Sequence, residues 1–301
     1  MADTTAYLNG RWVPSSALCL PVDDLGFLLG ATLVERMRTF GGKLFRLDDH
    51  LHRLQRSLEI VDWDAEAICR QVGNACNGFL HRNPSLVGSD DDWSVVVFIT
   101  PGHSRDASQP TVCVHGHPLP FRDWAGAYET GVEAVVVEIR QVPSECWPAE
   151  LKCRSRMHYY LADRQADSKS PGAKAILLDN EGYVGEGSTA NVVAYFTGRG
   201  LVTPCRSKVL PGVSQQVLFE LADSLGIPHR EEDLTPEQLG TADEAFFTST
   251  SICLQPIVRF NGRPLAEENP GPIFNQLIAA WSKLVGVEIR EQAKQLATRS
   301  G

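Results

Sequence analysis

The sequence predicts an α+β protein that folds as two domains with mixed sheets. Three observations support this class. The chain has 301 residues with 43% hydrophobic content, enough for more than one core. Strand-like and helix-like apolar patterns occur in both halves, without an internal repeat. A segment rich in proline, glycine and polar residues separates the halves, so we expect a small N-terminal domain over residues 1–120, a connection over 121–131 and a larger domain over 132–301.

Two hairpins are expected near the N-terminus. In "AYLNGRWVP" the pair Asn9-Gly10 supplies the positive φ angles that a tight turn demands. "VERMRTF" and "KLFRL" flank Gly41-Gly42 in the same manner. The sequence therefore places its first four strands in two hairpins.

Two helices and two strands complete the N-terminal half. "LDDHLHRLQRSLEIV" has Asp48 or Asp49 as the expected N-cap, followed by leucines at helical spacing. A second helix is expected over residues 64–81. "WSVVVFITP" and "PTVCVHGHPL" are typical of buried strands.

The C-terminal half mixes the same elements. "VEAVVVEI" predicts a strand, residues 153–168 a helix that begins directly after Lys152, and "AKAILLD" a strand that turns at "NEGY" into "VGEGSTANVVAYF". "LPGVSQQVLFELADSLGI" predicts a helix entered through Pro211-Gly212. "DEAFFTSTS" predicts a strand that ends in a polar turn, and residues 270–287 a terminal helix.

Composition argues against several classes of partner. The chain has 28 lysine and arginine residues and 37 aspartate and glutamate residues, which gives a formal net charge of −9. It contains no basic run of the kind that follows a phosphate backbone, so we expect no nucleic-acid partner. The start "MADTTAYLNGRWVP" lacks the features of a leader, and no window is apolar enough to span a membrane. We therefore expect no membrane partner and a cytoplasmic protein.

The cysteines and histidines give no metal motif. The eight cysteines are scattered without a CxxC pair, and we expect free thiols and small buried side chains. His50 with His52, and His115 with His117, lie two residues apart, but no HExxH occurs. We therefore expect no metal site.

"GEGSTAN", residues 185–191, begins like a dinucleotide fingerprint. The third glycine is missing and a strand-like segment follows, so no helix start would receive a pyrophosphate. Two interpretations remain. In one, the glycines let the backbone approach a flat ligand while Glu186 points at it; in the other, the segment is an ordinary polar loop.

Several short segments are suited to an anion. "PGVS" places Val213 and Ser214 at a helix start, where free N–H groups and the positive end of the dipole favour negative charge. "TSTS" places Thr250 and Ser251 in a turn, and Arg53 projects from the helix after Asp49. Together these groups could form a phosphate cup, although a serine at a helix start is more often only a cap.

Taken in order, these segments resemble one known family. "FRLxxHxxRL", the lysine at residue 152, "VxEGSxxN", "VLPGVS" and "DExFxTST" follow one another as in the fold type IV pyridoxal-phosphate enzymes, which include branched-chain and D-amino-acid transaminases and aminodeoxychorismate lyase. The resemblance runs from Tyr7 to Pro256. It implies a small N-terminal α/β domain, a larger C-terminal domain with a mixed β-barrel-like sheet, pyridoxal 5′-phosphate as the cofactor, and a homodimer whose active site lies near the subunit interface.

The resemblance also assigns roles to residues. Lys152 would form the Schiff base with the cofactor and transfer protons, and Glu186 would pair with the pyridine nitrogen. Arg53, Val213, Ser214 and Thr250 match the residues that hold the phosphate, and Ser251 belongs to the same turn as Thr250.

The substrate is less well defined than the cofactor. Val96 stands where branched-chain transaminases tend to have an arginine and the lyase a lysine, and Arg36 occupies a normally small position. Arginine is the usual ligand for a substrate carboxylate. The candidates are Arg36, Arg38, Arg105, Arg154 and Arg156. Alternation along "VERMRTF" puts Arg36 and Arg38 on one face. One hypothesis is that Arg36 or Arg38, alone or with Arg154 or Arg156, binds the carboxylate; the other is that each arginine pairs with a surface acid.

The function that follows is transfer of an amino group between an amino acid, branched-chain-like or D-configured, and a 2-oxo acid. The alternative is aminodeoxychorismate lyase, which releases pyruvate and 4-aminobenzoate with the same lysine and cofactor. A third possibility is a protein that carries the cofactor without turnover.

Overall fold

The computed structural model describes residues 4–84, 91–104, 109–265 and 270–298. These form two compact units. Unit 1 comprises Met1–Leu119 with Glu150–Ser155, and unit 2 comprises Pro120–Ala149 with Arg156–Gly301. The short segment that carries Lys152 therefore belongs with the N-terminal residues.

Unit 1 is built on one antiparallel sheet. Within the described residues this sheet has six strands, in the order β2-β1-β6-β5-β3-β4. The strands are β1 (Thr5–Leu8), β2 (Arg11–Pro14), β3 (Leu33–Phe40), β4 (Lys43–Leu44), β5 (Trp93–Thr100) and β6 (Thr111–Pro118). The helices are η1 (Ser15–Ala17), α1 (Leu25–Leu28), α2 (Leu47–Ile60) and α3 (Ala65–Arg82).

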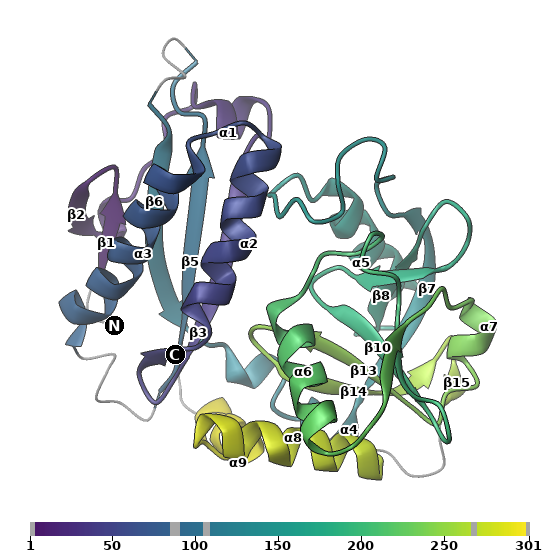
Figure 1. The fold of residues 1–301 in the computed structure, drawn as a ribbon. Helices are drawn as coiled ribbons and strands as arrows, with labels where there is room; N and C mark the ends of the chain where they lie inside the picture. Colours follow the sequence, from purple (N-terminus) through teal and green to yellow (C-terminus); the bar gives the residue numbers. More distant parts are fainter. Residues whose placement is uncertain (1–3, 85–90, 105–108, 266–269, 299–301) are drawn as a thin grey trace. The chain divides into compact units, whose positions relative to one another are not determined.

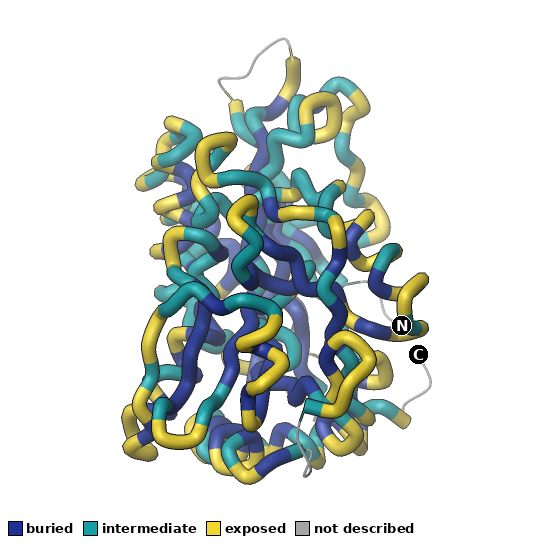
Figure 2. Tube along the Cα trace, turned by 90° about the vertical axis from the view of Figure 1, so that its right-hand side faces the viewer, coloured by how far each residue is buried: buried dark blue, intermediate teal, exposed yellow. Residues whose placement is uncertain are grey.

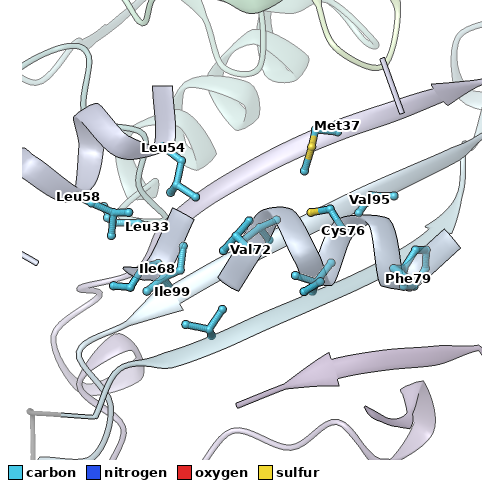
Figure 3. Close-up of a cluster of buried hydrophobic side chains, with 14 of the residues drawn as sticks. Leu33, Met37, Leu54, Leu58, Ile68, Val72, Cys76, Phe79, Val95 and Ile99 are labelled. Atoms are coloured by element: carbon cyan, nitrogen blue, oxygen red, sulfur yellow. The ribbon is translucent and has the colours of Figure 1, made fainter. Parts of the chain in front are cut away.

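Helices α2 and α3 cover one face of this sheet (Figure 1). Their apolar side chains meet those of β3, β5 and β6 in one buried cluster, part of which Figure 3 shows. Leu54 and Leu58 come from α2, and Val72 and Phe79 come from α3. The leucine spacing that predicted α2 is therefore the spacing of its buried face.

Both predicted hairpins are present. Asn9 and Gly10 have φ angles of 47° and 84° and join β1 to β2. Gly41 and Gly42, at 55° and 74°, join β3 to β4. Glycine reaches this left-handed region without steric cost, and asparagine tolerates it better than most residues do.

The predicted start of α2 is wrong by a few residues. Its N-cap is Arg46, which adopts a left-handed conformation and makes no side-chain cap hydrogen bond. Asp48 and Asp49 instead lie in the first turn of the helix. Their charges still favour the positive end of the helix dipole, which explains why acidic residues mark the start without capping it.

The predicted helix over residues 153–168 begins later, because α5 runs from Met157 to Lys169. The N–H of Val34 donates to the carbonyl of Lys152 at 3.0 Å, and the N–H of Arg154 donates to the carbonyl of Thr32 at 2.8 Å. Residues 152–154 thus pair with β3 and its approach. Lys152 lies on an extended segment instead of at a helix start.

Unit 2 contains a larger mixed sheet. Its strands are β7 (Val132–Arg140), β8 (Lys174–Leu178), β9 (Val184–Gly187), β10 (Asn191–Phe196), β11 (Gly200–Thr203), β12 (His229–Glu231), β13 (Glu244–Ser249), β14 (Cys253–Phe260) and β15 (Arg263–Pro264). Neighbouring strands pair in the order β10-β13-β14-β7-β8-β9, and β9 pairs again with β10 through Glu186 and Asn191. This closed ring confirms the expected barrel-like sheet.

The helices of unit 2 are η3 (Phe121–Asp123), α4 (Ala127–Thr130), α5, α6 (Val213–Ser224), α7 (Pro236–Leu239), α8 (Pro272–Val285) and α9 (Ile289–Ala297). Residues 121–131, the predicted connection, contain η3 and α4. The expected terminal helix is α8, which ends at Gly286 with a left-handed C-cap. The sequence prediction missed α9, whose nine residues begin at Ile289, after Val287 and the N-cap Glu288.

In Figure 2, exposed positions concentrate in turns and on outward helix faces, whereas most strand positions are buried. All eight cysteines are free thiols, as expected from their spacing. Across the described part of the chain, no helix combines the length and the apolarity needed to cross a bilayer.

Candidate active site

A buried ion-pair cluster in unit 1 contains Arg53. Its Nε and Nη2 donate to Oε1 and Oε2 of Glu35, each at 2.8 Å. The ring Nδ1 of His50 lies 2.9 Å from the same Oε2. His50, Arg53 and Ser57 all lie on the buried face of α2, while Glu35 comes from β3. A predicted phosphate ligand is therefore held bidentately by a carboxylate of its own unit.

The pKa values of this cluster follow from burial and charge. Burial opposes ionisation of Glu35, but the guanidinium of Arg53 and the hydrogen bond from His50 hold the pKa of Glu35 well below its ordinary value. Burial lowers the pKa of His50 below 6.5; the contact with Glu35 opposes this shift, and the charges of Arg53 and Lys152 add to it. His50 is therefore neutral near pH 7.

Lys152 lies beside the same helix. Its N–H donates to Oγ of Ser57 at 3.2 Å, and its charge acts on His50. The backbone of the next residue, Cys153, forms an isolated antiparallel β-bridge with Leu33, and its side chain packs against the apolar core of unit 1. The backbone of Lys152 is thus fixed between β3 and α2.

The two arginines of β3 have different surroundings. The side chain of Arg38 is buried, with Nη2 3.6 Å from Oδ2 of Asp92 and its guanidinium 3.9 Å from the ring centre of Phe40. The residue Arg36 is only half-buried and lies opposite Val96 of β5. Arg36 and Arg38 lie on one face of β3, as alternation predicts, but the guanidinium of Arg38 is paired with the buried carboxylate of Asp92. Arg105 lies outside the described residues.

In unit 2, Glu186 is a buried carboxylate that accepts hydrogen bonds from neutral donors. It is 8% exposed. The hydroxyl of Tyr159 on α5 donates to Oε1, and the N–H of Leu210 donates to Oε2 at 3.2 Å. Arg156 positions this tyrosine, because its guanidinium lies 4.5 Å from the ring centre and donates to the carbonyl of Ser188.

Asn191 joins the predicted phosphate residues to Glu186. It pairs with Glu186 across β9 and β10, and with Thr248 of β13 on its other side. Its Nδ2 donates to the carbonyl of Leu210 at 2.8 Å. Val213 and Ser214 open α6 just beyond that carbonyl, and Thr250 follows β13. Asn191 therefore connects Glu186 with the segment that leads into α6 and with the strand that precedes Thr250.

The two glycines beside Glu186 make room for side chains of their own unit. A Cβ on Gly185 would lie 2.2 Å from Oε1 of Gln141, and one on Gly187 would lie 3.0 Å from the ring of Phe247. A larger residue at Gly185 would therefore displace Gln141, and one at Gly187 would crowd the ring of Phe247.

Lys208 forms three ion pairs that hold the loop leading into α6. Its Nζ lies 2.9 Å from Asp179, 3.2 Å from Glu181 and 2.9 Å from Asp233. Burial works against its charge, but these three carboxylates raise the pKa of Lys208 above its ordinary value. The loop is thereby tied to the β8–β9 turn, which leads directly to Glu186.

Sequence reasoning missed Glu35, His50, Tyr159 and Asn191. His50 and Arg53 lie three residues apart on a helix, a spacing that puts them on one face, yet the sequence analysis treated the histidine only as a motif position and as a candidate metal ligand. Asn191 carried a signal as the last residue of "EGSTAN". No signal identified Tyr159, because its contact with Glu186 joins residues that are distant in sequence. Among the described residues, no group of three His, Cys, Asp or Glu side chains is arranged to hold a metal ion.

Comparison with known proteins identifies the family. The family model described as amino-transferase class IV matches residues 32–260, about three quarters of the chain. The chain belongs to the class IV aminotransferase family. A D-alanine aminotransferase of Staphylococcus aureus (strain N315) is 28% identical over 285 residues, covering 93% of this chain and 97% of that protein.

Solved structures of aminotransferases share the fold. The branched-chain aminotransferase of Thermoproteus uzoniensis, crystallised with norvaline, has a TM-score of 0.81 and 28% identity, covering 95% of this chain and 96% of that one. A branched-chain aminotransferase of Escherichia coli has a TM-score of 0.86 at 24% identity, covering 94% of this chain and 95% of that one, and shows the fold alone. The predicted fold type IV architecture and transaminase class are confirmed. Class IV aminotransferases use pyridoxal 5′-phosphate. The two relatives at 28% identity are named aminotransferases and do not favour the lyase alternative.

Proposed function

We propose that this aminotransferase acts on a branched-chain or D-amino acid and a 2-oxo acid, with Lys152 as the residue that binds the cofactor covalently. The observation that carries the proposal is the arrangement in unit 2, where Leu210 connects the buried carboxylate of Glu186 to the start of α6. An acid and a helix N-terminus at fixed spacing suit a molecule with a basic ring nitrogen at one end and a phosphate at the other.

The bound cofactor supplies an aldehyde that takes up the amino group and a ring that withdraws electrons from the substrate. Lys152 provides the amine for the covalent link and moves the proton at the substrate Cα. Glu186 keeps a proton on the ring nitrogen. The hydroxyl of Tyr159 and the N–H of Leu210, both neutral donors, orient Glu186.

The phosphate is assigned to the anion-binding groups. The first N–H groups of α6, at Val213 and Ser214, point along a helix of 12 residues whose dipole favours negative charge. Thr250 and Ser251 add the turn after β13. Arg53 contributes charge, and Glu35 holds two of its three guanidinium nitrogens in fixed positions.

The relatives support the substrate class. They are named as acting on D-alanine or branched-chain amino acids, and the chain matches both groups at 28% identity. Arg36 and Arg38 are the residues proposed for the substrate carboxylate. Because Arg38 already holds the buried Asp92, Arg36 is the better candidate.

We place the enzyme in the cytoplasm as a homodimer. Its free cysteines suit a reducing compartment. Near α1, Phe27 and Leu29 are 68% and 72% exposed, and an exposed apolar patch of this kind is typical of a subunit interface. Sedimentation of the wild-type protein beside Phe27→Glu tests this, with a dimer expected only for the wild type.

Absorption spectroscopy tests the assignment of function. The purified protein should show the visible band of the lysine-bound cofactor, and titration with an amino acid should remove this band. A 2-oxo acid should restore it. A panel of L- and D-amino acids then identifies the donor. Release of pyruvate from aminodeoxychorismate, with no response to any amino acid, would contradict the proposal.

A further inference from the structure

The loop that joins β13 to β14 has a closed base. Ser249 pairs with Cys253 across the two strands, which leaves a loop of three residues between them. The buried hydroxyl of Thr248 donates to the carbonyl of Cys253 at 2.7 Å and closes the same end of the hairpin. Thr250 and Ser251, the residues proposed for the phosphate, lie in this short loop.

The backbone of Cys253 is strained where the loop ends. Its φ angle is 58°, in the left-handed region that glycine reaches easily and most other residues avoid. Three-residue hairpin loops commonly contain one residue in this conformation. A residue other than glycine stays there when the surrounding structure imposes it, often at a functional site. The contacts that hold this loop are therefore candidates for a functional role.

Tyr128 of α4 contacts the loop from outside the hairpin. Its hydroxyl donates to the carbonyl of Ile252 at 2.7 Å, and the tyrosine is 1% exposed. The side chain of Ile252 packs against the apolar cluster of unit 2 that contains Phe247 and Ile257. Both the carbonyl and the side chain of this residue are therefore held, and the backbone that follows Ser251 is fixed.

Helix α4 is itself fixed against β14. The helix ends at Gly131, whose φ is 67°. A Cβ at Gly131 would overlap the side chain of Val258, so the end of α4 approaches β14 as closely as glycine permits. The next residue, Val132, begins β7 and pairs with Ile257 of β14. Tyr128 is therefore anchored to the strand into which the loop leads.

We propose that Tyr128 is a positioning residue for the phosphate of the cofactor, acting through Thr250 and the loop around it. This inference rests on the proposed function, because Thr250 is assigned there to the phosphate. Hydroxyl and N–H groups bind an anion well when they already converge on it, since a loop that must first be ordered loses entropy on binding. The hydrogen bond from Tyr128 orders this loop before the cofactor arrives.

Binding of two cofactor analogues, one with and one without the phosphate, tests the inference. The full-length protein, freed of cofactor, is titrated with pyridoxamine 5′-phosphate and with pyridoxamine, and each Kd is measured by equilibrium dialysis. In Tyr128→Phe the Kd for pyridoxamine 5′-phosphate should rise about 3- to 10-fold, the loss of one neutral hydrogen bond, while the Kd for pyridoxamine is unchanged. The phosphorus NMR resonance of bound pyridoxamine 5′-phosphate should shift as well.

Two further variants separate positioning from packing. Thr248→Val keeps the shape of the side chain and removes the hydroxyl at the base of the loop, so it should show the same phosphate-dependent loss. It decides the matter if Tyr128→Phe does not fold. Tyr7→Phe is the matched control, because its hydroxyl accepts a hydrogen bond from Gln71 in unit 1, and both Kd values should stay unchanged.

A double-mutant cycle tests whether Tyr128 acts through Thr250. Thr250→Val removes a hydroxyl proposed for the phosphate. Tyr128→Phe should raise the Kd for pyridoxamine 5′-phosphate by a smaller factor in the Thr250→Val protein than in the wild type, because residues of one network do not act additively. Equal factors in the two proteins would overturn the inference.

The outcomes separate this inference from the proposed function. If the wild-type protein prefers pyridoxamine 5′-phosphate over pyridoxamine, and Tyr128→Phe keeps both Kd values, the inference is wrong and the cofactor assignment stands. An equal rise in both Kd values would also overturn the inference, because Tyr128 would then support only the fold. If the wild-type protein binds neither molecule, or both equally, the cofactor assignment fails and this inference fails with it.

Discussion

Two buried glutamates, Glu35 in unit 1 and Glu186 in unit 2, show how similar burial serves different purposes. Glu35 is 1% exposed and paired with a guanidinium and an imidazole. Glu186, at 8%, accepts from a tyrosine hydroxyl and a backbone amide. The ion pair of Glu35 joins β3 to α2, whereas neutral donors from α5 and from the segment before α6 orient Glu186, the carboxylate that we propose pairs with the ring nitrogen of the cofactor.

Removing Glu35 should have the largest effect on folding. In Glu35→Ala, Arg53 is left in the interior without its carboxylate, and a broken buried pair costs about 3–5 kcal/mol. Denaturant unfolding of the apoenzyme measures this loss. Glu59→Ala, at an exposed position of α2, the helix that carries Arg53, should change the free energy of unfolding by less than about 1 kcal/mol. Equal losses for the two variants would remove the distinction.

Replacing Glu186 should instead affect catalysis. Glu186→Gln keeps the size of the side chain and removes its charge, so we expect kcat to fall about 100- to 1,000-fold, as for loss of one electrostatic contact to a reacting group. The free energy of unfolding should change by about 1 kcal/mol or less. Glu181→Gln, on the exposed β8–β9 turn, is the control. A strong loss of stability with normal kcat would make Glu186 a structural residue.

Acid should destabilise unit 1 through its buried histidine. The pKa of His50 is lowered from 6.5, so the unfolded chain binds a proton in a range where the folded protein does not. The contribution of neutral His50 to the free energy of unfolding is thus fully present above pH 6.5. It is lost as pH falls below 6.5, by up to about 1.4 kcal/mol per pH unit. Glu35, with its lowered pKa, remains ionised through this range and loses its contribution only in stronger acid.

Unfolding curves between pH 7 and pH 5 test this. His50→Gln should have a shallower dependence than the wild type. His115, whose pKa is lowered to about 4, contributes a slope of the same sign, and His115→Asn measures it separately. An unchanged slope in His50→Gln would show that the ring is already charged in the folded protein.

The smallest effect is expected from Tyr159. Tyr159→Phe removes one neutral hydrogen bond to Glu186 and should cost about 1 kcal/mol, seen as a kcat lower by about fivefold. Tyr160→Phe is a control on the exposed side of the same helix. A loss as large as that of Glu186→Gln would mean that the hydroxyl contacts the reacting groups directly.

Local chemistry explains what the sequence could predict about the fold. The positive φ of Asn9-Gly10 and Gly41-Gly42 is a property of those residues, and the leucines of α2 repeat with the period of a helix. The prediction of a helix directly after Lys152 failed, because the helical pattern begins only at Met157. Residues 152–154 instead pair with β3 and its approach. Those partners lie more than a hundred positions earlier in the chain, so the local sequence carries no signal of the pairing.

The sequence by itself determined the family and the kinds of groups in the candidate site: a lysine, an acid between glycines, and hydroxyls at a helix start and in a turn. These follow from short ordered motifs, each confined to a few residues. Only the tertiary structure decided the partners of those groups. Glu35 forms an ion pair with Arg53, Asp92 forms one with Arg38, and Tyr159 donates a hydrogen bond to Glu186. Side chains from separate strands and helices meet in this way only when their backbones are packed.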